Sequence, residues 1–371
     1  MDADTPEDTF TEEHRRLADA DPFELNPSEV FWVAHQPFLE SRGYQLRPRY
    51  RPGWVKSWKR TPGFNVEDAI SPVMPAFRVM DATRMSDGRV VILKRIKKAL
   101  YETEIEISHY LSQEAFLSDP RNHCAPLLDI LYPEASEIAF LVLPLLRHFK
   151  NPKMQSRQDA VDFVGQTLEG LVFMHEKGVA HRDCALYNIM MDPKDLYPEG
   201  YHPQRDFLTL DATRYAPVRR RHQVPFPRYY FIDFGISVRF RDGEPPIASG
   251  TDGQDRTVPE LQPKQDPTEP VEYNAFLLDV YILGNLYKNE LLMKYRGLAF
   301  LVPLIDRMTA KVPAQRPSAA EALELLQACR KRLLPLGIYR PIIPVKDGIA
   351  IRVAREAWYW GQRVTTIRRS A

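Results

Sequence analysis

Residues 181–188 read HRDCALYN and place an aspartate, Asp183, five positions before an amide, Asn188. Phosphoryl transfer from ATP needs an acid that orients the attacking hydroxyl and ligands for Mg²⁺. It also needs a cation on the phosphates and a carboxylate that holds this cation. In the pattern HRD-x-x-x-x-N, Asp183 supplies the acid and Asn188 supplies a Mg²⁺ ligand. One isolated match is weak evidence, so the other parts must be sought elsewhere in the chain.

Candidates for these parts occur on both sides of the loop. Lys94 ends the strand-like run VILK, and Glu104 lies on the helix predicted next. The tripeptide Asp233-Phe234-Gly235 offers a second, carboxylate ligand for Mg²⁺. Three later segments complete the set: Val258-Pro259-Glu260, residues 279–284 (DVYILG) and Arg316-Pro317-Ser318. Taken singly, each residue could be an ordinary surface or core residue, whereas the ordered set indicates one shared chemistry.

This ordered set resembles the eukaryotic protein kinase superfamily over residues 66–335. The phrasing around the motifs, such as NIMMD and RYYFIDFG, is also similar to a large fungal group of protein-kinase-like domains. The resemblance implies an α+β, bilobal fold. A small β-rich N-lobe with one helix would precede a larger, mainly helical C-lobe.

Hydrophobic periodicity predicts elements in the same order. Strands are expected at 77–84, 89–96, 126–131 and 138–143, and helices at 98–112, 159–178, 272–294, 298–310 and 318–334. A further short helix over 28–36 is expected to end at Pro37.

We expect three regions along the chain. Residues 1–65 form an N-terminal extension, with an acidic tail followed by a basic, aromatic segment. Residues 66–335 form the kinase domain, with the N-lobe at 66–146, the C-lobe at 147–335 and an insertion at about 192–226. Residues 336–371 form a basic C-terminal tail.

The resemblance assigns a role to each matched residue. Asp183 would orient the substrate hydroxyl and accept its proton, and Asn188 and Asp233 would hold Mg²⁺. Lys94 would hold the α- and β-phosphates of ATP, with Glu104 as its partner.

Three acids of the predicted helix compete for this last role. Glu104 shares a helical face with apolar residues and should point inward, whereas Glu102 and Glu106 lie nearly opposite and should be solvated. Arg182 would bind a phosphate on the activation segment, which runs from Asp233 to Glu260, and Thr251 is the first choice for the residue that carries it.

Five residues are expected around the adenine. Val79 and Ile92 would cover the ring, and Met190 would lie beneath it. In the hinge, Pro144 keeps its carbonyl for the adenine amino group, and Leu146 keeps its N–H for a ring nitrogen.

Three departures weaken the resemblance at the ATP site. No glycine occurs between Gly63 and Gly88, so the phosphate loop expected at residues 72–77 lacks glycine and contains two prolines. Glycine lets backbone N–H groups approach phosphates, and proline removes such donors. Ile92 replaces the usual alanine, and Ala185 stands where serine/threonine kinases usually have a lysine.

Composition and charge bear on the cellular compartment, on a membrane segment and on nucleic-acid binding. The net charge is +1, and three isolated cysteines indicate a reducing compartment. With no long apolar stretch, we expect no membrane segment and a cytoplasmic protein, with a nuclear one as the alternative. The aromatic, basic stretch 46–60 favours packing over nucleic-acid binding.

The leading hypothesis is an ATP- and Mg²⁺-dependent protein kinase, with serine or threonine as acceptor. Its partners would be a protein substrate and an upstream activating kinase. A pseudokinase that serves as a binding or scaffold module is the first alternative, since the altered loop and Ile92 disfavour ATP. A small-molecule phosphotransferase is the second, since it shares the Asp–Asn spacing.

Overall fold

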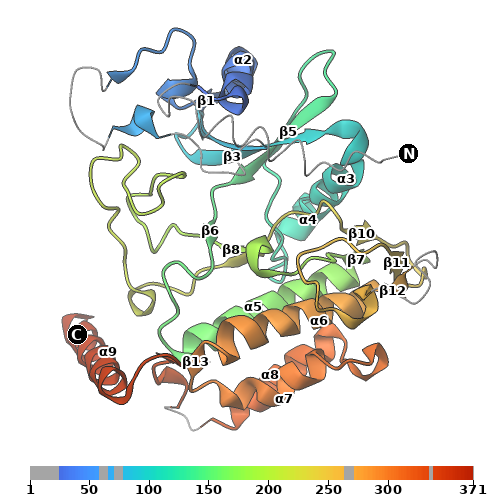
Figure 1. The fold of residues 1–371 in the computed structure, drawn as a ribbon, viewed down its shortest axis with the longest axis vertical. Helices are drawn as coiled ribbons and strands as arrows, with labels where there is room; N and C mark the ends of the chain where they lie inside the picture. The colour runs from blue at the N-terminus through green and yellow to red at the C-terminus, as the bar shows by residue number, and fades with distance from the viewer. Residues whose placement is uncertain (1–24, 58–65, 71–77, 263–270, 334–336, 371) are drawn as a thin grey trace. The chain divides into compact units, whose positions relative to one another are not determined.

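The computed structural model describes residues 25–57, 66–70, 78–262, 271–333 and 337–370, and Figure 1 shows its helices and strands. The chain forms two compact units. The first unit takes residues up to 98, 128–145 and 199–217, and the second takes 99–127, 146–198 and the chain from 218 onward. The phosphate loop expected at 72–77 lies outside the described residues.

The first unit contains an antiparallel sheet of five strands in the order β1-β2-β3-β5-β4. The strands are β1 (Tyr44–Leu46), β2 (Val79–Arg84), β3 (Val90–Lys97), β4 (Asp129–Leu131) and β5 (Ile138–Pro144). The four strands predicted from periodicity are confirmed as β2 to β5. The edge strand β1 comes from the expected N-terminal extension, so part of this extension joins the sheet.

Helix α2 (Pro27–Ser41) packs on one face of this sheet through the fully buried Trp32 and Leu39. The prediction that Pro37 ends the helix is wrong, because Pro37 lies inside it. Proline inside a helix costs roughly 3 kcal/mol, whereas burial of each large apolar side chain contributes roughly 1.5–3 kcal/mol. Beyond Pro37 both Leu39 and the partly buried Phe38 pack into the core, and their combined burial offsets the cost of the proline.

The two faces of the sheet carry different side chains. Residues directly opposite each other in an antiparallel pair share a face, so Met80, Leu93 and Val142 lie together, in the core with Trp32 and Leu39. The opposite face carries Val79, Asp81, Ile92, Lys94, Leu141 and Leu143. The nucleotide-binding residues expected on β2 and β3 therefore share the face away from α2.

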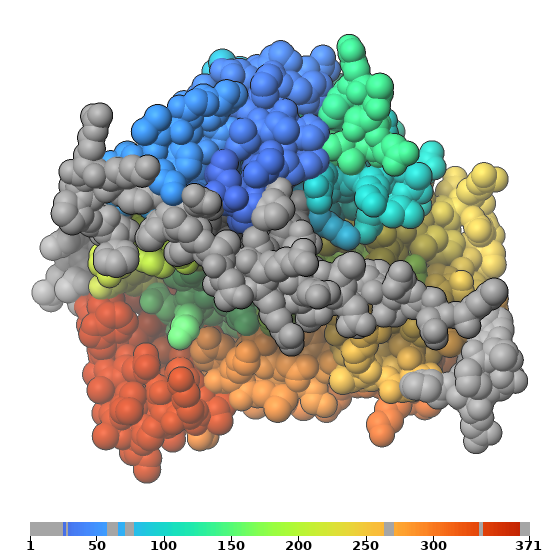
Figure 2. Space-filling model, turned by 45° about the horizontal axis from the view of Figure 1, so that its top comes forward, coloured from blue at the N-terminus to red at the C-terminus, as the bar shows by residue number. Residues whose placement is uncertain are grey.

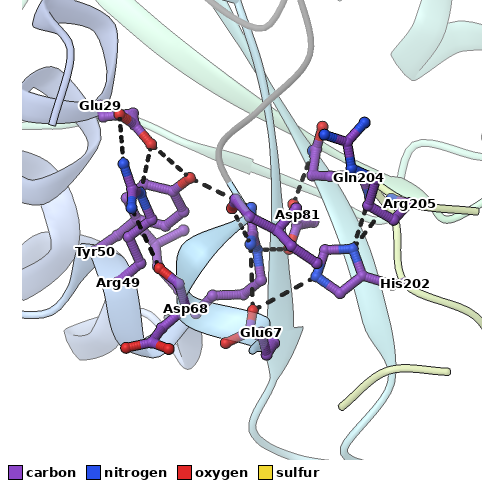
Figure 3. A network of polar contacts seen from close by, with 12 residues as sticks. Glu29, Arg49, Tyr50, Glu67, Asp68, Asp81, His202, Gln204 and Arg205 are labelled. Atoms are coloured by element: carbon purple, nitrogen blue, oxygen red, sulfur yellow. Dashed lines mark hydrogen bonds and ion pairs between the residues drawn. The ribbon is translucent and has the colours of Figure 1, made fainter. Parts of the chain in front are cut away.

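The basic, aromatic segment packs into the first unit wherever it is described. Arg49 forms an ion pair with Glu29 of α2 at 2.8 Å, and both side chains are fully buried (Figure 3). The indole N–H of Trp54 donates to Asp68 Oδ2 at 3.0 Å. A buried charge requires a partner of this kind, so these contacts favour a packing role for the segment.

Residues 199–217, part of the expected insertion, belong to the first unit. Gln204 Nε2 donates to Asp81 Oδ1 at 3.0 Å, and Arg47 Nε donates to Asp81 Oδ2 at 2.8 Å. Figure 3 shows Gln204 directed at Asp81. The insertion is thus fastened to the sheet face that carries the expected nucleotide-binding residues.

A second set of contacts holds the same insertion. Arg47 also binds Glu67 at 3.2 Å, and Glu67 lies 3.6 Å from His202 Nε2 (Figure 3). Three apolar residues form a small separate core: Ile70, Leu208 and Ala212. Polar and apolar contacts together make residues 199–217 an integral part of the first unit.

The second unit is mainly helical, and it includes residues 99–127, which were expected in the N-lobe. Its helices are α3 (Glu102–Leu111), α4 (Glu114–Leu117), α5 (Arg157–Glu176), α6 (Ala275–Tyr287), α7 (Val302–Met308), α8 (Ala319–Lys331) and α9 (Ile349–Ser370). Three strands, β6 (Arg147–His148), β8 (Ile189–Met191) and β9 (Tyr229–Phe231), form a small sheet. Strand pairs join β7 (Val179–Ala180) to β10 (Val238–Arg239), β11 (Ile247–Ser249) to β12 (Glu272–Asn274), and β13 (Tyr295–Arg296) to β14 (Ile343–Pro344). The β-rich first unit and the helical second unit confirm the α+β fold, compatible with two kinase lobes.

Helix α5 shows how the sequence sets an element's ends. Ser156 and Asp159 form a capping box at its start. Gly178, just after the helix, has φ +72°, and a Cβ there would lie 2.5 Å from the carbonyl oxygen of Phe240. Glycine is therefore required where the chain turns from α5 into β7.

The basic run 219–222 is partly internal. Arg221 is buried, and its guanidinium donates to the carbonyl oxygens of Phe149 and Pro152 and to the Tyr229 hydroxyl. These contacts make Arg221 a structural residue.

The expected basic tail contains helix α9. Residues 349–363 of this helix, drawn red in Figure 2, form part of the molecular surface, and Ile349 at its start is 77% exposed. Among the described residues, none of the helices combines the length and apolarity that a membrane span requires.

Candidate active site

The loop that carries the HRD motif is held by a buried carboxylate of α6. Asp279 is fully buried, and it accepts hydrogen bonds from the backbone N–H groups of His181 at 2.8 Å and Arg182 at 2.6 Å. His175 Nε2 lies 3.0 Å from the same carboxylate. Asp279 therefore fixes the backbone immediately before Asp183.

Asp183 and Asn188 meet as their spacing predicts. Asn188 Nδ2 donates to Asp183 Oδ2 at 2.7 Å and to the Asp183 carbonyl oxygen at 3.0 Å. Both residues are buried. Because the amide NH₂ is used on Asp183, the amide oxygen of Asn188 is the atom suited to a cation.

A residue that the sequence analysis missed also binds Asp183. The backbone N–H of Gln254 donates to Asp183 Oδ1 at 2.8 Å, and its side-chain amide donates to Oδ2 at 3.0 Å. Its amide oxygen accepts from the N–H of Tyr187 at 3.3 Å. Gln254 is exposed and part of no motif, so the sequence offered only the nearby glycines as a sign of a special turn.

Asp233 lies near the same loop through strand pairing. Residues 189–191 pair antiparallel with 229–231, and the N–H of Ile232 donates to the carbonyl oxygen of Asn188 at 3.0 Å. The start of β8 thus adjoins the end of β9. Carboxylate and amide oxygens suit Mg²⁺, so Asn188 and Asp233 fit the expected metal ligands by chemistry and by strand position.

Glu104 lies close to the DFG motif. It is 2% exposed, whereas Glu102 and Glu106 are exposed, so the predicted inward face of α3 is confirmed. A Cβ on Gly235 would lie 3.5 Å from Glu104 Oε2 and 3.2 Å from Asp233 Oδ1. The second unit therefore brings both acids to Gly235.

Two of the four described non-glycine residues with a positive φ angle are motif residues. Arg182 has φ +66° and Asp233 has φ +65°, a region that costs energy for residues with a side chain. Strain of this kind persists where surrounding contacts enforce it, and it is common at functional sites. The two conformations are consistent with a functional role for both loops.

Cys184 follows Asp183 but has no sign of nucleophilic activation. It is fully buried, and burial, reinforced by the Asp279 and Asp183 carboxylates, raises the pKa of its thiol well above the usual range. A thiolate is the reactive form of cysteine. The environment therefore favours Asp183 over Cys184 as the chemically active group of this loop.

The remaining expected residues divide between the units. Val79, Ile92, Lys94 and Pro144 belong to the first unit, whereas Leu146 and Met190 belong to the second, with Glu104. Val79 stands directly opposite Lys94 across the β2–β3 pair. The pairing of Lys94 with Glu104, which would link the units, stays a prediction.

Glu260 and Arg316, which lie in two of the later motif segments, form an ion pair. Arg316 Nη1 and Nη2 donate to Glu260 Oε1 and Oε2 at 2.5 and 2.7 Å, a bidentate arrangement. The arginine side chain is fully buried and the glutamate side chain is 11% exposed. Arg316 also donates to the carbonyl oxygens of Leu277 and Ala310, so it ties the segment around Glu260 to α6.

Comparisons with known proteins indicate a distant kinase relationship. No family model matches the chain. The chain is 25% identical to protein kinase C eta type from Mus musculus over 138 residues, which is 35% of this chain and 19% of that protein. The protein of the same name from Rattus norvegicus gives the same values. The matched region thus spans about a fifth of these relatives, and it supports a protein-kinase-like relationship.

Proposed function

We propose that the protein transfers the γ-phosphate of ATP to a hydroxyl group of a protein substrate, on serine or threonine. The arrangement around Asp183 carries this proposal, because Asn188 orients its carboxylate and Asp233 follows the adjoining strand. The distant similarity to protein kinase C eta type supports the same reaction class. The Glu260–Arg316 pair favours a protein substrate over a small molecule, since in the kinase family it anchors the activation segment.

Asp183 would act as the proton acceptor. The substrate hydroxyl would donate to the Asp183 carboxylate in place of the Gln254 amide, and its oxygen would attack the γ-phosphorus. The bond from that phosphorus to the β–γ bridging oxygen breaks, ADP leaves, and the hydroxyl proton passes to Asp183. Mg²⁺ held by Asn188 and Asp233 would neutralise charge on the phosphates.

A pseudokinase that serves as a binding module is the second candidate, and two observations favour it. Both oxygens of Asp183 already accept hydrogen bonds. Asp81, directly opposite Ile92 on the expected nucleotide face, is bound by Arg47 and by Gln204 of the insertion. Side chains of the protein itself thus occupy part of the substrate-binding surface at Asp183 and part of the expected nucleotide-binding face at Asp81.

Nucleotide binding separates the two candidates. We expect weak, Mg²⁺-dependent ATP binding, since loss of one or two charge-assisted hydrogen bonds from a glycine loop weakens affinity roughly tenfold to several thousandfold. Ile92→Ala should bind ATP more tightly because the side chain is smaller. Lys94→Met should abolish detectable binding, as measured by calorimetry with and without Mg²⁺.

Lys97→Met is the matched control, because Lys97 lies on the same strand, is exposed and faces the other side of the sheet. It should leave ATP affinity unchanged. Absence of binding at millimolar nucleotide would favour the scaffold, and equal effects of Lys94→Met and Lys97→Met would remove Lys94 from the site. Labelled ATP with Mg²⁺ and a peptide library then tests transfer itself.

Gln254→Ala tests whether the amide competes with the substrate. The hydroxyl must displace one charge-assisted hydrogen bond, so its removal should raise kcat/KM by about tenfold or more. Gln262→Ala, which changes another glutamine of the segment, should have a smaller effect. A fall in kcat for Gln254→Ala would instead show that the amide positions Asp183 for catalysis.

A further inference from the structure

The guanidinium of Arg182 donates its hydrogen bonds to uncharged acceptors. Its Nε and Nη2 donate to the Tyr273 hydroxyl at 3.0 and 2.6 Å. Nη1 donates to the carbonyl oxygen of Ile236 at 2.9 Å, and Nη2 to that of Ser249 at 2.6 Å. The arginine is 8% exposed, so these bonds replace water around a nearly buried cation.

Two of these acceptors, Ile236 and Ser249, lie in the activation segment, and the third, Tyr273, lies on the strand that follows it. Ile236 directly follows the DFG motif, and Ser249 ends β11. Tyr273 lies on β12, which pairs antiparallel with β11 and places Ala248 opposite Tyr273. One guanidinium therefore binds the beginning of the segment, its hairpin strand and the strand that precedes α6.

The backbone on both sides of these contacts is fixed as well. Asn274, next to Tyr273, caps α6 through its side chain, and Asp279 of α6 holds the Arg182 N–H. Gly250 turns the chain after β11 with φ +96°, and a Cβ there would lie 3.4 Å from Arg182 Nη2. Contacts with α6 and with the activation segment thus hold the Arg182 guanidinium in place.

The Tyr273 hydroxyl is neutral in this setting. Burial raises the pKa of its phenol above the usual range. Its ring also lies beneath the guanidinium, with Arg182 Cζ 5.7 Å from the ring centroid, within the range of a cation–π contact. The Arg182 guanidinium is therefore stabilised by a hydroxyl, two carbonyl groups and an aromatic face. In a phosphorylated kinase, the charge of a phosphate would take this role.

We propose that Tyr273, through Arg182, holds the activation segment in its ordered position without a phosphate. Tyr273 is then a positioning residue for the proposed phosphoryl transfer, on whose assignment of this segment the inference rests. An upstream kinase acting on Thr251 is not required, since the donors that would bind the phosphate are already engaged. Thr251 itself is exposed, and its carbonyl oxygen accepts from Arg256 at 2.9 Å.

Hydrogen exchange of the segment tests this inference directly. In the full chain treated with phosphatase, peptides covering residues 247–257 should stay protected, as they are before treatment. Tyr273→Phe removes only the hydroxyl that accepts two bonds from a charged group, and should raise their exchange rate about 10- to 150-fold. Tyr295→Phe, which changes a half-buried tyrosine of β13, should leave it unchanged.

Two results would overturn the inference. One is a gain in exchange on phosphatase treatment of the wild type, because the segment would then depend on phosphate. The other is wild-type protection in Tyr273→Phe. Neither measurement needs catalysis, so a protein that orders the segment through Tyr273 but transfers no phosphate would refute the proposed function alone.

Discussion

Asp183→Asn should lower the rate of phosphate transfer by about 10²- to 10⁴-fold, because it removes the general base of the proposed reaction. Asparagine is nearly isosteric and keeps one oxygen to accept from Asn188 or Gln254. The fold and the affinity for ATP should therefore change little. Transfer is measured with labelled ATP in single turnovers, and ATP affinity by calorimetry.

Asp306→Asn provides the comparison, because Asp306 is an exposed residue of α7 in the same unit. It should transfer phosphate at the wild-type rate. Undiminished transfer by Asp183→Asn would contradict the active-kinase proposal. Loss of ATP binding in this variant would instead assign Asp183 to nucleotide binding.

Arg316→Ala should destabilise the second unit by about 3–5 kcal/mol. The substitution leaves the Glu260 carboxylate, which is 11% exposed, without its bidentate partner. It also removes the hydrogen bonds that Arg316 donates to the carbonyl oxygens of Leu277 and Ala310. The free energy of unfolding, measured in denaturant, gives the loss.

An exposed ion pair of the same unit gives the matched control. Arg121 binds Glu176 at 2.9 Å, with both side chains more than 40% exposed. Glu176→Ala should cost no more than about 1 kcal/mol, since water screens such pairs. If Arg316→Ala costs as little as Glu176→Ala, the buried pair does not stabilise the unit. A double Glu260→Ala/Arg316→Ala variant should lose less than the sum of the single losses, because the two residues are in direct contact.

The sequence by itself determined the kinase-like motifs and the main elements. Strands β2 to β5 and helices α3, α5 and α6 follow from local periodicity. The contact between Asp183 and Asn188 follows because the two residues lie five positions apart in one loop. The inward face of Glu104 follows from helical spacing alone.

Only the tertiary structure decided how distant segments meet. Strand β1 ends at Leu46, 33 positions before its sheet neighbour β2 begins at Val79. Residues 199–217 belong to the first unit although they lie within the sequence expected to form the C-lobe. Tyr273 and Gln254 reach Arg182 and Asp183 across 91 and 71 positions. Hydrogen bonds between such distant residues leave no periodic trace in a sequence, because one side chain at one position makes each contact. Pro37 shows the same limit, since its local preference to end a helix was outweighed by packing against a sheet formed by later residues.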